Sequence, residues 1–507
     1  MTIRPTTRIG GIASGLDTET MVRDMVRAHR VRVDRLTQNR TQLEWRRDDL
    51  RALNTQLTTL RNRTFDMTLQ GAYRRFNVAS SNEAVVTATA TGNASAMALE
   101  FSAITRLAGS TRATSTGSIV LAPHTTIDAN APLAQLISAG QIDGAALPGT
   151  FDVTVFNHNQ AGTRVSETFT VNTATDSLNS VLSRISSSQT LGLQAFYDTF
   201  SGRVSITSRF PGNNNPAAAD MGFEGAGAAF FNTTLRMAVQ DGQNAQFTLN
   251  GLATERGTNN FTINGVAFTL RNTLAPGAAA TVTVTPDHDA VVRNIEDFVK
   301  SYNDTLERFN TALTAERHRD FLPLTDEQRK EMSEDDIKRW QERARSGLLR
   351  GDDGLERIVN RMRRDFNDPV SDTTLRQMSV IGIRTMHHGE GGRLHIDTTK
   401  LRAELEKDSG AVQDLFAKTA QRLRSSLDTS VRELNAQAGA ASSFLRADSS
   451  VIGQQMQRLN DRIVREEDRI SRVEDRLWRQ FTSLERAMER MNSQSAWLAQ
   501  QFAPRQQ

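Results

Sequence analysis

The chain has 507 residues, with a formal net charge of only +3, 38% hydrophobic residues and 23% charged residues. This length allows three or four domains. No stretch approaches the roughly 18 consecutive apolar residues of a membrane helix, and the N-terminus lacks the apolar core of a secretory signal peptide. The chain contains no cysteine, which excludes disulfides, thiolate metal sites and thiol nucleophiles. Acidic residues accompany most of the arginines, so the charge pattern does not favour nucleic-acid binding.

The first predicted element is one long helix over residues 18–69. Asp17 precedes it, and its side chain can accept hydrogen bonds from the free amides of the first turn. Apolar residues recur at heptad spacing, as in a coiled coil. One row contains Val22, Leu36, Leu43, Leu50 and Leu57, and a second contains Met25, Leu53, Leu60 and Met67. Polar residues interrupt both rows, so we predict an incomplete seam that needs a partner helix.

Strands are predicted between about residues 72 and 288, where charge falls and Ala, Thr, Ser, Asn and Gly dominate. Short alternating apolar and polar runs indicate half-buried strands. The clearest case is 261–270, where Asn264-Gly265 tolerates positive φ at both central turn positions and predicts a β-hairpin. One helix is predicted near 177–185.

Helical periodicity returns after the strands. Thr325 and Ser333 each begin a pattern typical of a helix N-terminus. Further helices are predicted at 354–367 and from 398 onward, on either side of a short hairpin around 389–392.

The last predicted element, residues 451–503, mirrors the first. Its heptad row contains Met456, Ile463, Ile470, Leu477, Leu484, Met491 and Leu498. Each terminal helix has about 50 residues and a length of roughly 75–80 Å. Two terminal seams of matched length predict antiparallel pairing of the chain ends, with the β-rich middle inserted between them.

Several motifs carry a family resemblance. They are residues 11–18, 43–57, 79–90, 261–270, 295–303, 323–350, 381–384 and 392–397. Together they resemble the flagellar filament cap family, also called flagellar hook-associated protein 2. The resemblance covers about residues 1–110 and 245–507, whereas 111–244 matches only loosely.

We therefore predict a multidomain α plus β chain with long coiled-coil-like terminal helices, a helical leg domain and inserted β-rich head domains. The terminal helical region would combine 1–40 with 455–507, and the leg would combine 41–75 with 286–454. A β-rich head domain would combine 76–120 with 236–285. Residues 121–235 would form an inserted, outer β-rich head domain.

The resemblance implies a non-enzymatic structural protein at the tip of the bacterial flagellar filament. It implies a homo-oligomeric ring that promotes folding and insertion of exported flagellin, next to hook-associated junction proteins. It also implies export by the flagellar type III system without a Sec signal, an extracellular location, and a cytosolic chaperone that holds the C-terminus before export. Nucleic-acid binding, membrane insertion and a cofactor are not expected.

The terminal seams are the predicted assembly interface. Its candidate residues are Leu36, Leu43, Leu50, Leu57, Ile463, Ile470, Leu477, Leu484, Met491 and Leu498. Because polar residues interrupt both seams, the partner can be the other terminal helix, another subunit or flagellin.

Four patterns imitate catalytic or metal sites, and each has a simpler structural explanation. They are the histidine-rich stretch 387–397, Asp-His-Asp at 287–289, the glycine-bounded segment 10–15 and Gly-Asp-Asp-Gly at 351–354. The resemblance implies an ordinary hairpin at the first, and helix capping explains the second. The third lacks the Lys-Ser/Thr of a phosphate-binding loop, and the fourth is too short for a calcium loop. No catalytic, cofactor or metal residue is predicted.

Two alternative functions are compatible with this pattern. Residues 111–244 could make the chain an adhesin for host mucin or another glycan. The chain could also be a different flagellar axial protein, such as a hook–filament junction protein, although the block 323–350 argues against this.

Overall fold

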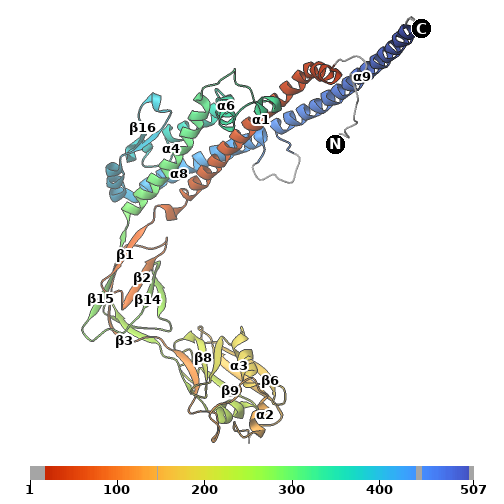
Figure 1. Ribbon diagram of the computed structural model, residues 1–507. Helices are drawn as coiled ribbons and strands as arrows, with labels where there is room; N and C mark the ends of the chain where they lie inside the picture. Colours follow the sequence, from red (N-terminus) through yellow and green to blue (C-terminus); the bar gives the residue numbers. More distant parts are fainter. Residues whose placement is uncertain (1–16, 145–146, 441–447, 502–507) are drawn as a thin grey trace. The chain divides into compact units, whose positions relative to one another are not determined.

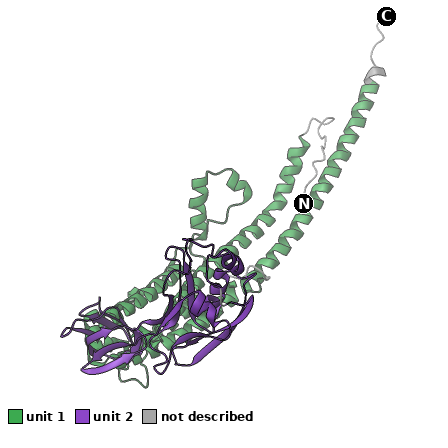
Figure 2. Cartoon of the chain, turned by 90° about the horizontal axis from the view of Figure 1, so that it is seen from below, with its two compact units in different colours: residues 1–73, 288–507 green, residues 74–287 purple. Residues whose placement is uncertain are grey.

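The computed structural model describes residues 17–144, 147–440 and 448–501. Its contacts divide the chain into two compact units. Unit 1 combines residues 1–73 with 288–507, and unit 2 contains residues 74–287, as coloured in Figure 2. The β-rich middle is therefore inserted into a helical unit, as predicted.

Unit 1 is built mainly from helices (Figure 1). Its long helices are α1 (Thr18–Asp66), α4 (His288–Thr314), α7 (Asp353–Asn367), α8 (Thr398–Ala438) and α9 (Val451–Gln501). Its shorter elements are α5 (Asp326–Lys330), α6 (Glu334–Arg345), β16 (Ile383–Thr385) and β17 (Leu394–Ile396). The two long terminal helices predicted from the heptads are confirmed, with 49 residues in α1 and 51 in α9.

Three predicted helix starts are confirmed by their side-chain caps. The amide of Thr20 donates to Asp17 Oδ1 over 2.9 Å at the start of α1. Thr325 and Ser333 accept in the same way at the starts of α5 and α6, each over 3.3 Å. These bonds satisfy amides that have no partner within the helix.

The predicted antiparallel pairing of the chain ends is confirmed for the first half of α1. Arg32 of α1 pairs with Glu466 of α9 over 3.3 Å. The second half of α1 instead packs on α8, where the Asn54 amide donates to Asn435 over 2.7 Å. Residues later in α1 contact residues earlier in the sequence of α9 and α8, so both pairings are antiparallel (Figure 1). The sequence analysis did not foresee α8 as the second partner.

Unit 1 contains one large apolar core and one small, separate cluster. The large core gathers residues from α1, α4, α7 and α8, including the fully buried Leu57, Phe298 and Phe416. The small cluster, between α1 and α9, is centred on Val22 and Val26.

Unit 2 is built from antiparallel sheets. The first group of strands is β1 (Phe76–Ser80), β2 (Val86–Ala90), β3 (Met97–Arg106), β11 (Ala245–Leu249), β12 (Leu252–Arg256), β13 (Asn260–Ile263), β14 (Val266–Leu270) and β15 (Ala279–Pro286). They form sheets with the orders β1-β15-β3-β11-β12 and β13-β14-β2. The predicted hairpin is confirmed, because Asn264 and Gly265 form its turn with φ of 47° and 76°.

The second group of elements in unit 2 surrounds another core. It consists of β4 (Ser110–Ser115), β5 (Thr150–His158), β6 (Arg164–Asn172), β7 (Leu193–Asp198), β8 (Arg203–Pro211), β9 (Met221–Glu224), β10 (Met237–Gln240), α2 (Leu133–Ser138), α3 (Leu178–Ser187) and a π-helical turn at Phe230–Thr234. The sheets have the orders β10-β4-β8-β7 and β6-β5-β9. The helix predicted near 177–185 is confirmed as α3.

The two cores of unit 2 use separate parts of the chain. One draws on residues between Val85 and Ile104 and between Ala245 and Val284, and the other on residues from Ala113 to Met237. Strand β4 belongs to the sheet of the second core, although the predicted boundary at 120 assigned it to the first head domain. The division of the whole chain into four parts stays a prediction.

None of the helices in the described ranges combines the length and apolar character needed to cross a membrane.

Candidate assembly interface

The first part of the candidate interface is the contact between the start of α1 and α9, which contains few buried apolar side chains. Val22 and Val26 of α1 are buried against Ile470, with Trp478 and Phe481 of α9 packed alongside. Such a small cluster buries little apolar surface, so it contributes far less stability than the large core. Elements held by few buried apolar contacts open more easily than a packed core, so we expect this pairing to open before the large core does.

Ion pairs add only modest support to this pairing. Arg32 of α1 meets Glu466 of α9 over 3.3 Å, and this arginine is largely exposed. Arg27, also largely exposed, pairs instead with Glu327 of α5 over 3.6 Å. Exposed pairs of this kind contribute about 0–1 kcal/mol each. Burial raises the pKa of Asp34, and the nearby Glu327 carboxylate raises it further.

The predicted interface residues of α1 lie mostly inside the chain. Leu50 and Leu57 are fully buried in the large core of unit 1, Leu36 is buried, and Leu43 is half-buried against that core. In a single chain these four side chains are therefore already occupied by intramolecular packing.

The predicted row of α9 changes from buried to exposed along the helix. The exposed fractions are 8% for Ile463, 9% for Ile470, 46% for Leu484, 65% for Met491 and 47% for Leu498, while Leu477 is half-buried. This change arises because α1 covers only the first part of α9. Because Arg32 lies opposite Glu466 in an antiparallel pair, Thr18 lies beside about residue 480.

The last part of α9 therefore extends about 30 Å beyond the start of α1. Every described side chain from 491 to 498 is exposed. We name Leu484, Met488, Met491 and Leu498 the distal stripe. These residues follow the spacing of a coiled-coil seam, a pattern that a second helix can cover.

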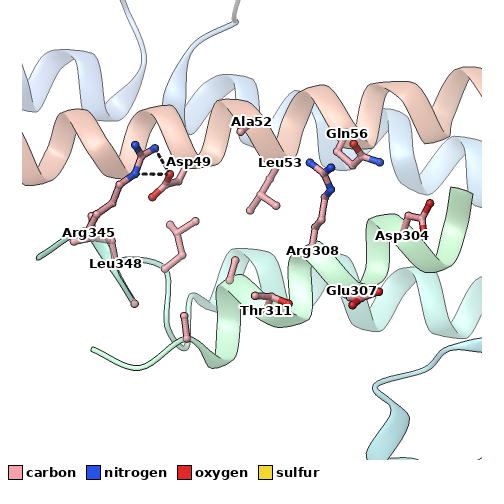
Figure 3. Close-up of a pocket in the computed structure, with 14 residues that line it drawn as sticks. Asp49, Ala52, Leu53, Gln56, Asp304, Glu307, Arg308, Thr311, Arg345 and Leu348 are labelled. Carbon is pink, nitrogen blue, oxygen red and sulfur yellow. Dashed lines mark hydrogen bonds and ion pairs between the residues drawn. The ribbon is translucent and has the colours of Figure 1, made fainter. Parts of the chain in front are cut away.

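Unit 1 also contains a groove between α1 and α4 that the sequence did not predict (Figure 3). It has a volume of about 660 Å³, and the turn 347–349 that follows α6 contributes to its wall. At one end, the Arg345 guanidinium donates to Asp49 of α1 over 3.0 Å. The groove could not be anticipated from local patterns, because its walls come from three segments far apart in the sequence.

The sites weighed as catalytic or metal-binding contain ordinary structural contacts. His395 Nε2 lies 2.6 Å from a Glu390 carboxylate oxygen, and Asp289 pairs with Arg402. Asp352 caps α7 by accepting from the Gly354 amide over 2.9 Å. Across the described ranges, no group of three histidine or carboxylate side chains is placed to hold a metal ion. The segment 10–15 lies outside the described residues.

Comparison with known proteins decides the family. Residues 14–111 match the model for the flagellar hook-associated protein 2 N-terminus, and residues 242–493 match the model for its C-terminus. The chain belongs to the flagellar hook-associated protein 2 family.

Relatives in this family extend along nearly the whole chain. Flagellar hook-associated protein 2 of Halalkalibacterium halodurans is 29% identical, over 98% of this chain and 99% of its own length. That of Escherichia coli K12 is 23% identical, over 97% of each chain. A crystal structure of the D1-D2-D3 domains of the flagellar cap protein FliD from Escherichia coli has the same fold. It matches with a TM-score of 0.56 and 20% identity, over 81% of this chain and 99% of that one.

Between them, the two family models leave residues 112–241 unmatched. This gap contains the second core of unit 2, whose residues run from Ala113 to Met237. The family resemblance predicted for the two ends of the chain is thus confirmed.

Proposed function

We infer that this hook-associated protein 2 chain is the structural cap at the tip of the bacterial flagellar filament. The observation that carries this inference is the match of both family models, one on each side of the inserted segment. The long antiparallel terminal helices and the β-rich inserted unit agree with the fold of the Escherichia coli cap protein.

We propose that several copies form a ring and that flagellin folds and is inserted beneath it. The exposed distal stripe supports an assembly role, because apolar side chains at coiled-coil spacing gain stability when a second helix covers them. Within the predicted interface, the exposed Leu484, Met491 and Leu498 are the residues available to another subunit or to flagellin. The weak pairing of α1 with α9 would let these contacts rearrange as the cap moves.

The same stripe supports a proposal for the time before assembly. An exposed apolar helix face is an aggregation hazard in the cytosol. A chaperone that covers this C-terminal helix would protect it until export by the flagellar type III system, without a Sec signal. At the filament, hook-associated junction proteins would be the neighbours on which the cap first assembles.

We propose a structural rather than an enzymatic role. The polar side chains at the candidate sites serve as helix caps and ion pairs, as with Asp352 and His395. The comparisons do not favour the adhesin or junction-protein alternatives.

A gene deletion tests the proposed function. The deletion strain should release unpolymerised flagellin into the medium and should be non-motile, and the intact gene supplied in trans should restore both. Filaments of normal length in the deletion strain would overturn the proposal.

A further inference from the structure

The groove between α1 and α4 has an apolar floor and a charged rim. Leu53 of α1 and Leu349 of the turn after α6 form part of the floor, with 8% and 4% of their surfaces exposed. The exposed side chains of Asp304, Glu307, Arg308 and Thr311 line the α4 side (Figure 3). We name this the leg groove. Its volume of about 660 Å³ is enough for several side chains of a partner.

A second feature of unit 1, the β16–β17 hairpin, carries an exposed apolar side chain and two exposed arginines. Met386, directly after β16, is 52% exposed. Arg384 in β16 and Arg393 directly before β17 are also exposed. Methionine adapts well to an irregular apolar pocket.

The hairpin is held firmly on α4. Asn303 of α4 makes two hydrogen bonds to the main chain of Leu394, over 2.8 and 2.9 Å. Arg363 of α7 donates to the carbonyl of Gly391 over 2.8 Å. Because the hairpin is already ordered, a partner that binds it loses little conformational entropy.

The leg groove and the hairpin use different sides of α4. Asn303 and Asn310 face the hairpin, to which both donate hydrogen bonds, whereas Arg308 and Ala312, on another side of the helix, line the groove. Figure 1 shows β16 and α1 on either side of α4. Two different surfaces on one subunit are what a head-to-tail contact requires, and such contacts form a ring when the rotation between subunits closes.

We propose that the leg groove of one subunit receives the β16–β17 hairpin of the next subunit in the ring. The two surfaces carry opposite net charge. On the groove, Arg345 pairs with Asp49, and the two carboxylates of Asp304 and Glu307 exceed the one guanidinium of Arg308. On the hairpin, Glu390 pairs with His395, which leaves Arg384 and Arg393 as the exposed cations. Met386 would enter the apolar floor, and Arg384 and Arg393 would face Asp304 and Glu307 on the rim. The inference rests on the proposed cap function, because it assigns a contact within the proposed ring.

The absence of cysteine from the natural chain allows a direct cross-linking test. Thr311→Cys places one thiol on the groove, and Met386→Cys places one on the hairpin of a separate chain. At a concentration where the unaltered chain sediments as an oligomer, mixing and oxidising the two variants should give a disulfide-linked dimer. Each variant oxidised alone should give none, and neither should Thr311→Cys mixed with Ser425→Cys, an exposed position on α8.

A charge exchange gives a second measurement. Asp304→Arg with Glu307→Arg, or Arg384→Glu with Arg393→Glu, should each raise the concentration needed for assembly by about tenfold or more, because like charges then face each other. A chain carrying all four changes should recover assembly, which a merely misfolded variant would not do.

The outcomes separate this inference from the function on which it rests. If the chain sediments as an oligomer without the mixed disulfide and without recovery in the fourfold variant, the groove has another occupant, such as a flagellin helix, and the inference is overturned. The proposed cap function would survive that result. A chain that stays monomeric at every concentration would overturn both the ring and the contact within it.

Discussion

Gly242 lies where three main-chain segments of unit 2 meet. Its amide donates to Thr111 Oγ1 over 2.8 Å, and a Cβ at this position would lie 2.8 Å from the Gly109 carbonyl oxygen and even closer to that of Gly212. Main-chain atoms held by hydrogen bonds cannot yield as a flexible side chain can.

We therefore expect Gly242→Ala to destabilise unit 2 by about 1–3 kcal/mol. Chemical denaturation of the full chain, followed by a probe in unit 2, measures this loss. Gly149→Ala is the matched control, because a Cβ there meets nothing within 4 Å. Equal stability of the two variants would show that the three main-chain segments around Gly242 are not tightly packed.

Asp365 in α7 is a buried carboxyl with only part of its hydrogen-bonding capacity used. Its residue surface is 8% exposed, and Oδ2 has no partner among the described residues. Burial raises its pKa, against the lowering effects of the Ser426 hydrogen bond and of Arg422 and Arg364. The Arg422 guanidinium donates to the main-chain carbonyls of Asp365 and Asp368.

A raised pKa in the folded state means that the folded chain holds this proton more tightly than the unfolded chain. Its contribution to stability is therefore present at acid pH and is lost as pH rises through the raised pKa. Asp365→Asn cannot ionise, so its free energy of unfolding relative to the natural chain should be higher at pH 7 than at pH 4. Urea unfolding at both pH values measures this difference, and a difference that does not change with pH would contradict the assignment.

Residue-scale features were predictable only where they are local. Asp17, Thr325 and Ser333 were identified as caps because a cap bonds to amides two or three positions away. The constraints on Gly242 and Asp365 come from segments distant in sequence, and no local pattern reveals them.

At the scale of elements, the heptad rows of α1 and α9 end in different surroundings. Leu57 of α1 is fully buried in the large core, whereas Leu484 of α9 is 46% exposed on the distal stripe. Leu57→Ala should destabilise unit 1 by about 2–5 kcal/mol, because it leaves a cavity. Leu484→Ala should change the stability of the isolated chain by no more than about 0.5 kcal/mol while weakening assembly.

Thermal unfolding and sedimentation of the two variants test this division. Loss of stability in both would mean that the distal stripe is covered within the chain. If both variants still assemble normally, the distal stripe is not part of the proposed interface.

The heptads predicted the two terminal helices and their antiparallel direction, but not all of their partners. A seam records which face of a helix is apolar, and several partner helices satisfy the same spacing. That is why α8, which covers the second half of α1, was missed.

At the scale of the whole molecule, the shift from heptads to alternating strands predicted an inserted β-rich unit, and the motifs predicted the family. The hairpin around 389–392 was also predicted and is confirmed as the β16–β17 pair. The leg groove was not predicted, because it depends on how α1, α4 and the turn after α6 come together, which is a property of the packed unit.

The central claim is that this chain occupies the growing tip of the filament. Electron microscopy of intact cells, with gold-labelled antibody against the chain, tests it most directly. We expect label at the free end of each filament and none on filaments of the deletion strain. Label at the hook–filament junction, or along the filament shaft, would contradict the claim.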